Sequence, residues 1–102
     1  MNYFCPKESD WKLFRKLVPV WQENYMGRLL AEYQKIINEN NNPSTRFWKL
    51  NDRMMNDKKS PGVLINMRRS KMYENIEIML RDNVINYNDL AEFSEELRLY
   101  FK

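Results

Sequence analysis

Three cationic side chains share one side of a helix that the sequence predicts over residues 44–58. Arg46, Lys49 and Arg53 fall within roughly 60° of one another, because each residue turns an α-helix by about 100°. A row of this kind can hold a phosphate backbone or an acidic protein surface. The ordinary interpretation is a solvated face beside an apolar one, and Asp52 and Asp57 dilute the charge.

Further candidates for binding a partner lie close by in the sequence. They are Lys58, Lys59, Arg68, Arg69 and Lys71, together with the aromatic Trp48. Helices over 44–58 and 61–82, joined by a short turn, would also have the lengths of a helix-turn-helix. The basic residues lie too far from the start of the second helix for a good match, so this remains an alternative.

Arg69 poses a separate question. It falls in the middle of the apolar side of the helix predicted over 61–82, between Ile65, Met72 and Ile76. An unpaired buried guanidinium costs several kcal/mol. Three explanations are open: the helix begins nearer Ser70 and Arg69 reaches solvent, Arg69 pairs with an acid of another helix, or it lines a groove that receives a carboxylate or phosphate.

The usual groups for catalysis are scarce. The sequence has no histidine, one cysteine (Cys5), two glycines and no phosphate-binding loop. Acid–base chemistry would fall to a carboxylate or a lysine, but Glu95 and Glu96 are adjacent and diverge on a helix. No set of His and Cys matches a zinc site. We therefore expect a protein that is not an enzyme and that needs no metal or cofactor.

Aromatic and methionine side chains are plentiful and are favoured where proteins bind one another. Aromatic residues make up 14% of the chain, with seven methionines. At helical spacing we expect most of them in the core. Trp11 and Trp48 lie at the edges of their apolar arcs and should be partly exposed. Leu99 points away from the core side of its helix and could mark a dimer contact.

Helices must position these residues. We expect an N-terminal arm over 1–8 and helices over about 9–18, 19–39, 44–58, 61–82 and 87–101. Pro19 should break or sharply kink the first of these, because it removes a backbone donor and its ring crowds the preceding turn. Ser44, Ser60 and either Asn86 or Asn88 are expected to cap the later helices.

The apolar stripes predict how these helices pack. After Tyr25 the stripe moves around the helix, so its second half should pack on different neighbours from the first. Arg28 and Glu32 lie four residues apart at this change and should form an ion pair within the helix. The apolar arc of helix 44–58 should face the core and consists of Phe47, Trp48, Leu50, Met54 and Met55.

Composition bounds the fold class. Glycine is scarce and no long run alternates, so strands are improbable. We predict an all-α fold: a compact bundle of four to five helices with short loops and no sheet, in a single domain over 1–102. The net charge of +3 is too small to indicate nucleic acid by itself. The lone cysteine and the absence of a signal-like or membrane-spanning run favour the cytoplasm.

Several short segments follow one another in a recognisable order. They are Asp10-Trp11, Trp21, Tyr25-Met26, Phe47-Trp48, Asp57 to Val63, Met67 to Ser70, and Asp89 to Leu97. In that order they resemble a family of small uncharacterised bacterial proteins of low-GC bacteria, about this long, and the likeness covers nearly the whole chain. The resemblance implies an all-helical cytoplasmic domain. It carries over no activity, cofactor or partner.

The sequence thus predicts a non-catalytic protein-interaction or regulatory module whose partner is another protein. One alternative is a nucleic-acid-associated protein that uses the basic helix stripe. Another is an obligate homo-oligomer, such as a dimer, that buries its surplus apolar surface against itself. We expect no membrane contact.

Overall fold

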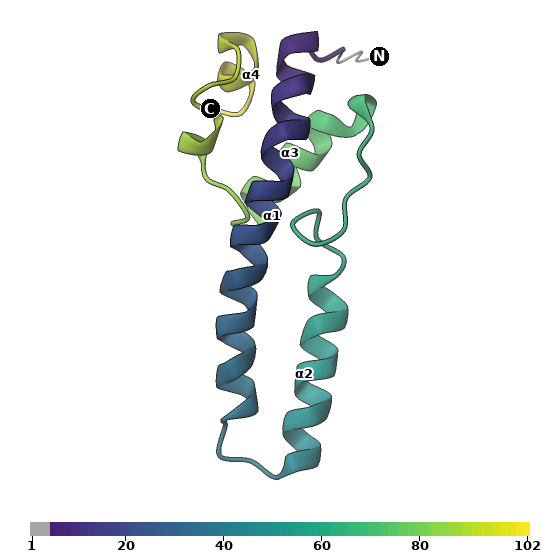
Figure 1. Cartoon of the computed structure of the whole chain (residues 1–102), viewed down its shortest axis with the longest axis vertical. Helices are drawn as coiled ribbons and strands as arrows, with labels where there is room; N and C mark the ends of the chain where they lie inside the picture. Colours follow the sequence, from purple (N-terminus) through teal and green to yellow (C-terminus); the bar gives the residue numbers. More distant parts are fainter. Residues whose placement is uncertain (1–4) are drawn as a thin grey trace.

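The protein is helical throughout its regular structure (Figure 1). The computed structural model describes residues 5–102. Within that range the order is α1 (Glu8–Ile37), α2 (Pro43–Asp57), the 3₁₀ turn η1 (Arg69–Lys71), α3 (Met72–Arg81), the 3₁₀ turn η2 (Tyr87–Leu90) and α4 (Glu95–Tyr100). No strand occurs in the described residues, so the predicted all-α class is confirmed.

One helix replaces the two predicted over 9–18 and 19–39, so the break expected at Pro19 is wrong. Pro19 lies inside α1 and is exposed. A proline in a helix interior costs about 3 kcal/mol. That cost is offset by packing on both sides of the proline, where Phe14, Val18 and Trp21 are buried. Tertiary contacts thus override the local preference.

The two halves of α1 pack on different neighbours, as predicted. Phe14, Val18 and Trp21 belong to a core shared with α3, η2 and α4. Further along α1, Leu29, Tyr33 and Ile36 form a smaller cluster that faces α2. We call the first region the head and the pair formed by α2 and the second half of α1 the hairpin.

The head collects short elements around the start of α1. Its fully buried side chains include Met72, Ile76 and Met79 of α3 and Leu97 of α4. The carboxylate of Asp10, itself buried, accepts hydrogen bonds from the Ser94 backbone N–H (2.9 Å) and hydroxyl (2.6 Å). Because Ser94 is the N-cap of α4, this contact fixes the start of α4 against the first turns of α1.

The segment between α2 and α3 is mostly irregular, so the helix predicted over 61–82 is wrong for residues 61–68. Ser60, Pro61 and Gly62 form a buried turn. A Cβ on Gly62 would lie 2.5 Å from the ring of Tyr25, so this residue must be glycine for the turn to approach α1. The side chain of Asn75 then donates to the carbonyl of Asn66 at 3.0 Å and holds the following loop against α3.

The helix predicted over 87–101 is divided in two. Asn86 caps η2 in a reciprocal arrangement with Asp89, as one of the two expected caps, and Ser94 opens α4 separately. In both places a cap side chain accepts a hydrogen bond from the backbone N–H three residues later: Asn86 from Asp89, and Ser94 from Leu97. Two such caps within one short segment favour two short helical turns over one continuous helix.

The molecule is longer than its size alone requires. Its extents are 51 × 26 × 21 Å and its radius of gyration is 16.4 Å, whereas a compact domain of this length has about 13 Å. Figure 1 shows the reason: the hairpin projects from the head as two antiparallel helices, with the short loop at the far end. No helix within residues 5–102 has the length and apolar character needed to cross a bilayer.

Candidate functional site

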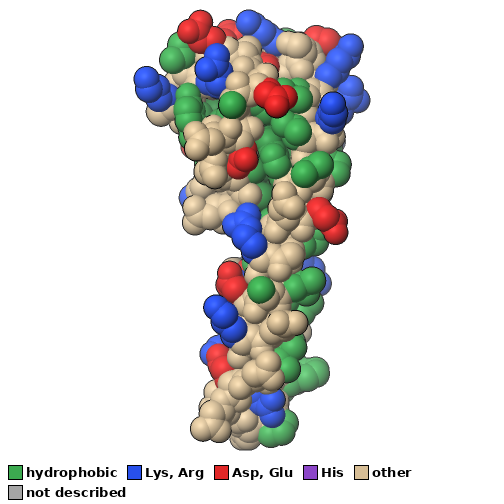
Figure 2. Space-filling model, turned by 60° about the vertical axis from the view of Figure 1, so that its left-hand side comes forward, with side chains coloured by type: hydrophobic (Ala, Val, Ile, Leu, Met, Phe, Trp, Pro, Cys, Tyr) green, Lys and Arg blue, Asp and Glu red, His purple; other side chains and the backbone are tan. Residues whose placement is uncertain are grey.

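The hairpin carries large apolar side chains that no part of residues 5–102 covers. Figure 2 shows apolar side chains running along one side of the hairpin. Those with a large exposed fraction are Leu30 and Ile37 of α1 and Phe47, Trp48, Met54 and Met55 of α2. We call this set the hairpin apolar face. The prediction that the apolar arc of residues 44–58 faces the core is therefore wrong for most of its members.

The outward orientation follows from what α2 offers to α1. Asp57 is the only buried residue of α2, and Leu50, Arg46 and Arg53 are half-buried beside it. The contact between the two helices therefore rests largely on charged and polar side chains. Since these occupy the side of α2 that meets α1, Phe47 and Met54 lie at the edge of that contact, and Trp48 and Met55 lie farther from it.

The predicted basic stripe exists, but it is turned toward α1. Arg46 donates to the carbonyls of Ile37 and Asn41 and so satisfies the end of α1. Lys49 forms an ion pair with Glu39, with 2.6 Å between Nζ and Oε2, and this contact lowers the pKa of Glu39. These cations stabilise the hairpin itself.

Arg53, the third member of the stripe, joins a network on a buried carboxylate. Its Nε lies 3.0 Å from Oδ2 of Asp57, and its Nη2 pairs with Glu32. The hydroxyl of Tyr33 donates to Asp57 Oδ2 at 2.5 Å. Burial and this hydrogen bond to a carboxylate raise the pKa of Tyr33 to about 12. The pairing with Glu32 also raises the pKa of Arg53.

Arg28 and Glu32 are used differently from the predicted ion pair within the helix. Arg28 donates to the carbonyls of Asn83 and Val84, both at 2.9 Å, just beyond the end of α3. Glu32 instead pairs with Arg53 of α2. Each residue of the predicted pair therefore makes a tertiary contact, one toward the head and one toward the hairpin.

The remaining sequence-predicted cations do not form one surface with the stripe. Lys58, Lys59 and Arg68 are exposed, and Lys71 lies 3.8 Å from Glu74. Arg69 donates to the carbonyl of Pro6 and to Glu8. Two of its three explanations match in part: the helical segment begins only at Arg69, whose side chain is 37% exposed, and Arg69 pairs with the acid Glu8 of α1. Trp48 is 60% exposed, in line with its predicted position at the edge of an arc.

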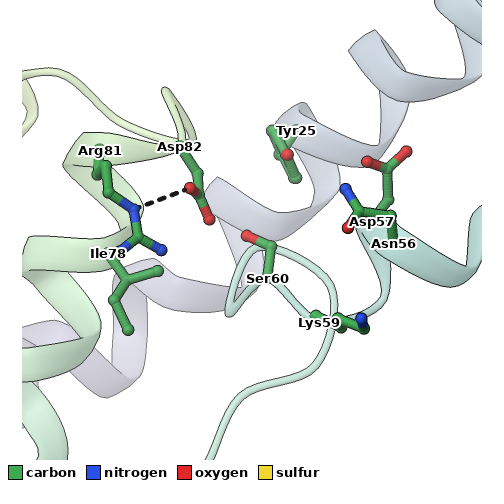
Figure 3. A pocket seen from close by; sticks show the side chains of 8 residues that line it. All are labelled: Tyr25, Asn56, Asp57, Lys59, Ser60, Ile78, Arg81 and Asp82. Carbon is green, nitrogen blue, oxygen red and sulfur yellow. Dashed lines mark hydrogen bonds and ion pairs between the residues drawn. The ribbon is translucent and has the colours of Figure 1, made fainter. Parts of the chain in front are cut away.

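A polar cleft lies where the hairpin joins the head (Figure 3). It has a volume of about 340 Å³ and lies between Tyr25 of α1, the end of α2 and the end of α3. Three of its four charged residues have partners, since Arg81 lies 3.4 Å from Asp82 and Asp57 is held by Arg53 and Tyr33, while Lys59 is exposed. Burial raises the pKa of the Tyr25 phenol. The described residues contain no group of three or more His, Cys, Asp or Glu that could hold a metal ion.

Comparison with known proteins adds no relative. The chain matches no protein-family model, no curated protein and no solved structure.

Sequence reasoning missed the orientation of the hairpin apolar face. The signal was present in the pattern: Asp57 and Arg53 lie four residues apart on one side of α2, and Tyr33 and Glu32 on α1 offer partners of the right kind. A charged cluster that is complementary between two neighbouring helices indicates that they meet through that cluster. Apolar side chains on the other sides are then left exposed.

Proposed function

We propose that this protein is a non-catalytic interaction module, regulatory in role, that binds another polypeptide chain through the hairpin apolar face. The observation that carries the proposal is the exposure of that face: Phe47, Trp48 and Leu30 are 64%, 60% and 61% exposed. Soluble proteins seldom leave contiguous apolar patches above a few hundred Å² unless they bind there.

The types of residue support the same function. Trp and Phe supply large rigid contact areas, and tryptophan is among the residues most often found where binding energy concentrates. Met54 and Met55 add side chains that adapt to a partner's shape. The rings of Phe47 and Trp48 meet edge to face with centroids 5.1 Å apart, so each limits the movement of the other. Less side-chain entropy is then lost on binding.

A role on nucleic acid has less support. Arg46, Lys49 and Arg53 would be its central contacts, but all three make hydrogen bonds or ion pairs inside the hairpin. The exposed cations Lys58, Lys59 and Arg68 lie outside that row. Phosphate binding would therefore need to replace intramolecular contacts that stabilise the fold.

A cytoplasmic location and membership of the bacterial family that the sequence resembles are parts of the same proposal. The lone cysteine supports the first of these, since Cys5 is free and exposed and so adds no disulfide to the fold.

Site-specific photo-crosslinking in the natural host tests the proposed function. A photoreactive phenylalanine analogue replaces Trp48, and in a matched control it replaces Glu77, an exposed residue of α3 in the head. We expect covalent adducts with a polypeptide from position 48 and few from position 77. Equal labelling from both positions, or none from position 48, would contradict the proposal.

A further inference from the structure

Neutral residues and charges of both signs flank the hairpin apolar face. Asp52 follows Trp48 by four residues, and Lys58 and Lys59 follow Met54 and Met55 by four; all three are exposed. Gln34 follows Leu30 by four residues and Asn51 follows Phe47 by four, so each lies about 40° from its apolar neighbour. Both are exposed. Glu32 and Lys49, two residues beyond Leu30 and Phe47, are turned by about 200° to the other side. The ion pairs of the hairpin therefore lie on the side away from this face.

A face with this rim is complementary to a copy of itself. An isologous interface brings the same patch of both copies together, so each residue at the rim of one copy meets rim residues of the other copy. A charged rim of one sign would repel its copy, whereas a rim that carries both Asp52 and the two lysines can place opposite charges together across a two-fold axis. Amide side chains both donate and accept hydrogen bonds, so Gln34 and Asn51 can pair with their own equivalents. A different partner whose surface has one sign of charge would meet a like charge somewhere on this rim.

From these observations we propose that a second copy of this chain occupies the hairpin apolar face, so that two hairpins form a four-helix bundle. The inference rests on the proposed function and names the partner. Two hairpins packed face to face would bury the apolar side of all four helices, which is the arrangement that stabilises such bundles. Alone, the hairpin has only Leu29, Tyr33 and Ile36 as buried apolar residues.

The available area fits a dimer. The six side chains of the face are between 43% and 64% exposed. Taking about 200 Å² for a fully exposed large side chain, they offer on the order of 600 Å² of apolar surface. A standard protein interface takes about 800 Å² from each partner. The flanking neutral residues, Gln34 and Asn51 among them, can supply the remaining area.

Sedimentation equilibrium of the purified chain tests the inference, with two leucine variants as a matched pair. Leu30 and Leu99 are 61% and 59% exposed, on the hairpin and on α4. We expect the wild-type mass to rise with concentration from 12.6 kDa toward twice that value. Leu30→Glu should raise the dissociation constant at least about 100-fold, because it places a carboxylate in an apolar interface. Leu99→Glu should change it by less than about twofold.

Circular dichroism checks that both variants keep the helical fold, which we expect because both leucines are exposed. A wild-type chain that stays monomeric at sub-millimolar concentration would overturn the second copy as the partner. Loss of the dimer in Leu99→Glu with no effect of Leu30→Glu would also overturn it. Failure of the proposed function is distinguishable, because it is read from cross-links of position 48 to any polypeptide.

Discussion

Tyr33, Arg53 and Asp57 hold the two helices of the hairpin together through one carboxylate. The phenol donates to it from α1 and the guanidinium from α2. Because Asp57 is buried, each donor satisfies a lone pair that water does not reach. These polar contacts between the two helices specify the register of the hairpin, together with Leu50, the apolar residue of α2 that packs against the buried cluster on α1.

Tyr33→Phe removes one of these donors and keeps the ring. We expect the free energy of unfolding at neutral pH to fall by about 1.5–3 kcal/mol, the usual value for a hydrogen bond to a charged group. Urea denaturation measures it. An unchanged midpoint would mean that Tyr33 does not support Asp57.

The same variant predicts a pH dependence. The folded-state pKa of Tyr33 is raised to about 12 from an ordinary value near 10. A raised pKa means that the neutral phenol stabilises the fold below pH 10, and that this contribution is lost as the pH rises from 10 toward 12. The difference in stability between wild type and Tyr33→Phe should therefore shrink over that range. A constant difference would contradict the contact.

Gly62 and Gly27 make a matched pair for testing the turn before α3. A Cβ on Gly62 would lie 2.7 Å from Val84 as well as close to Tyr25, whereas at Gly27 no atom lies within 4 Å. We expect Gly62→Ala to destabilise the fold by about 1–3 kcal/mol, since the turn must move away from α1. Gly27→Ala should stabilise dilute protein by about 0.5–1 kcal/mol, because alanine suits a helix interior better. Thermal melts of both variants measure these changes, with a lower melting temperature expected for Gly62→Ala and a higher one for Gly27→Ala.

At the scale of elements, α1 is the axis of the molecule. One end carries the head, the other forms the hairpin, and Pro19 lies between them without ending the helix. Tyr25 packs against both clusters and therefore links the two regions. The 30 residues of α1 determine where every other element docks.

Pro19→Ala tests how far packing overrides the local sequence. The proline is exposed, so its removal loses little packing and restores one backbone donor. We expect a gain of about 1–2 kcal/mol in stability, which is less than the full cost of an interior proline because alanine also frees the unfolded chain. Chemical denaturation measures the gain. A loss of stability would show that the ring itself is needed in α1.

The elements differ in how well the sequence predicts them. Helical periodicity was enough to locate α2, although the helix begins at Pro43, before the cap expected at Ser44, and Asn86 was recognisable as a cap. The irregular stretch before α3 was not predictable, because it depends on Gly62 meeting Tyr25, a contact between residues far apart in sequence. For the candidate site, the sequence identified Trp48 and the basic row, but not which side of α2 would meet α1.

At the scale of the whole molecule, the head has a closed core and the hairpin does not. Phe14, Met72, Ile76 and Leu97 are fully buried in the head, while α2 has no buried apolar residue. A projecting hairpin with one apolar side is a shape suited to insertion between or against other helices. The distribution of burial therefore divides the molecule into a head with a closed core and a hairpin with an exposed apolar face, which is the basis of the proposed binding role.

Weak attraction to nucleic acid follows from the same distribution. The net charge is +3, and the central cations of the predicted stripe make intramolecular contacts. We expect no measurable binding to duplex DNA or RNA at physiological salt, and only shallow salt dependence below it, because the row of cations that would follow a phosphate backbone is held in intramolecular contacts and the net charge is small. Fluorescence anisotropy across a salt series measures this. A steep slope with tight binding would favour the nucleic-acid alternative.

Hydroxyl-radical footprinting that compares two exposed methionines of the hairpin with two buried methionines of the head tests the outward orientation of the hairpin apolar face most directly. Met54 and Met55 are 43% and 55% exposed, and Met72 and Met79 are fully buried. In dilute protein Met54 and Met55 should be oxidised at least about tenfold faster than Met72 and Met79, because oxidation follows exposure. Equal protection of all four in the dilute monomer would contradict the structure of the hairpin and the binding role assigned to it.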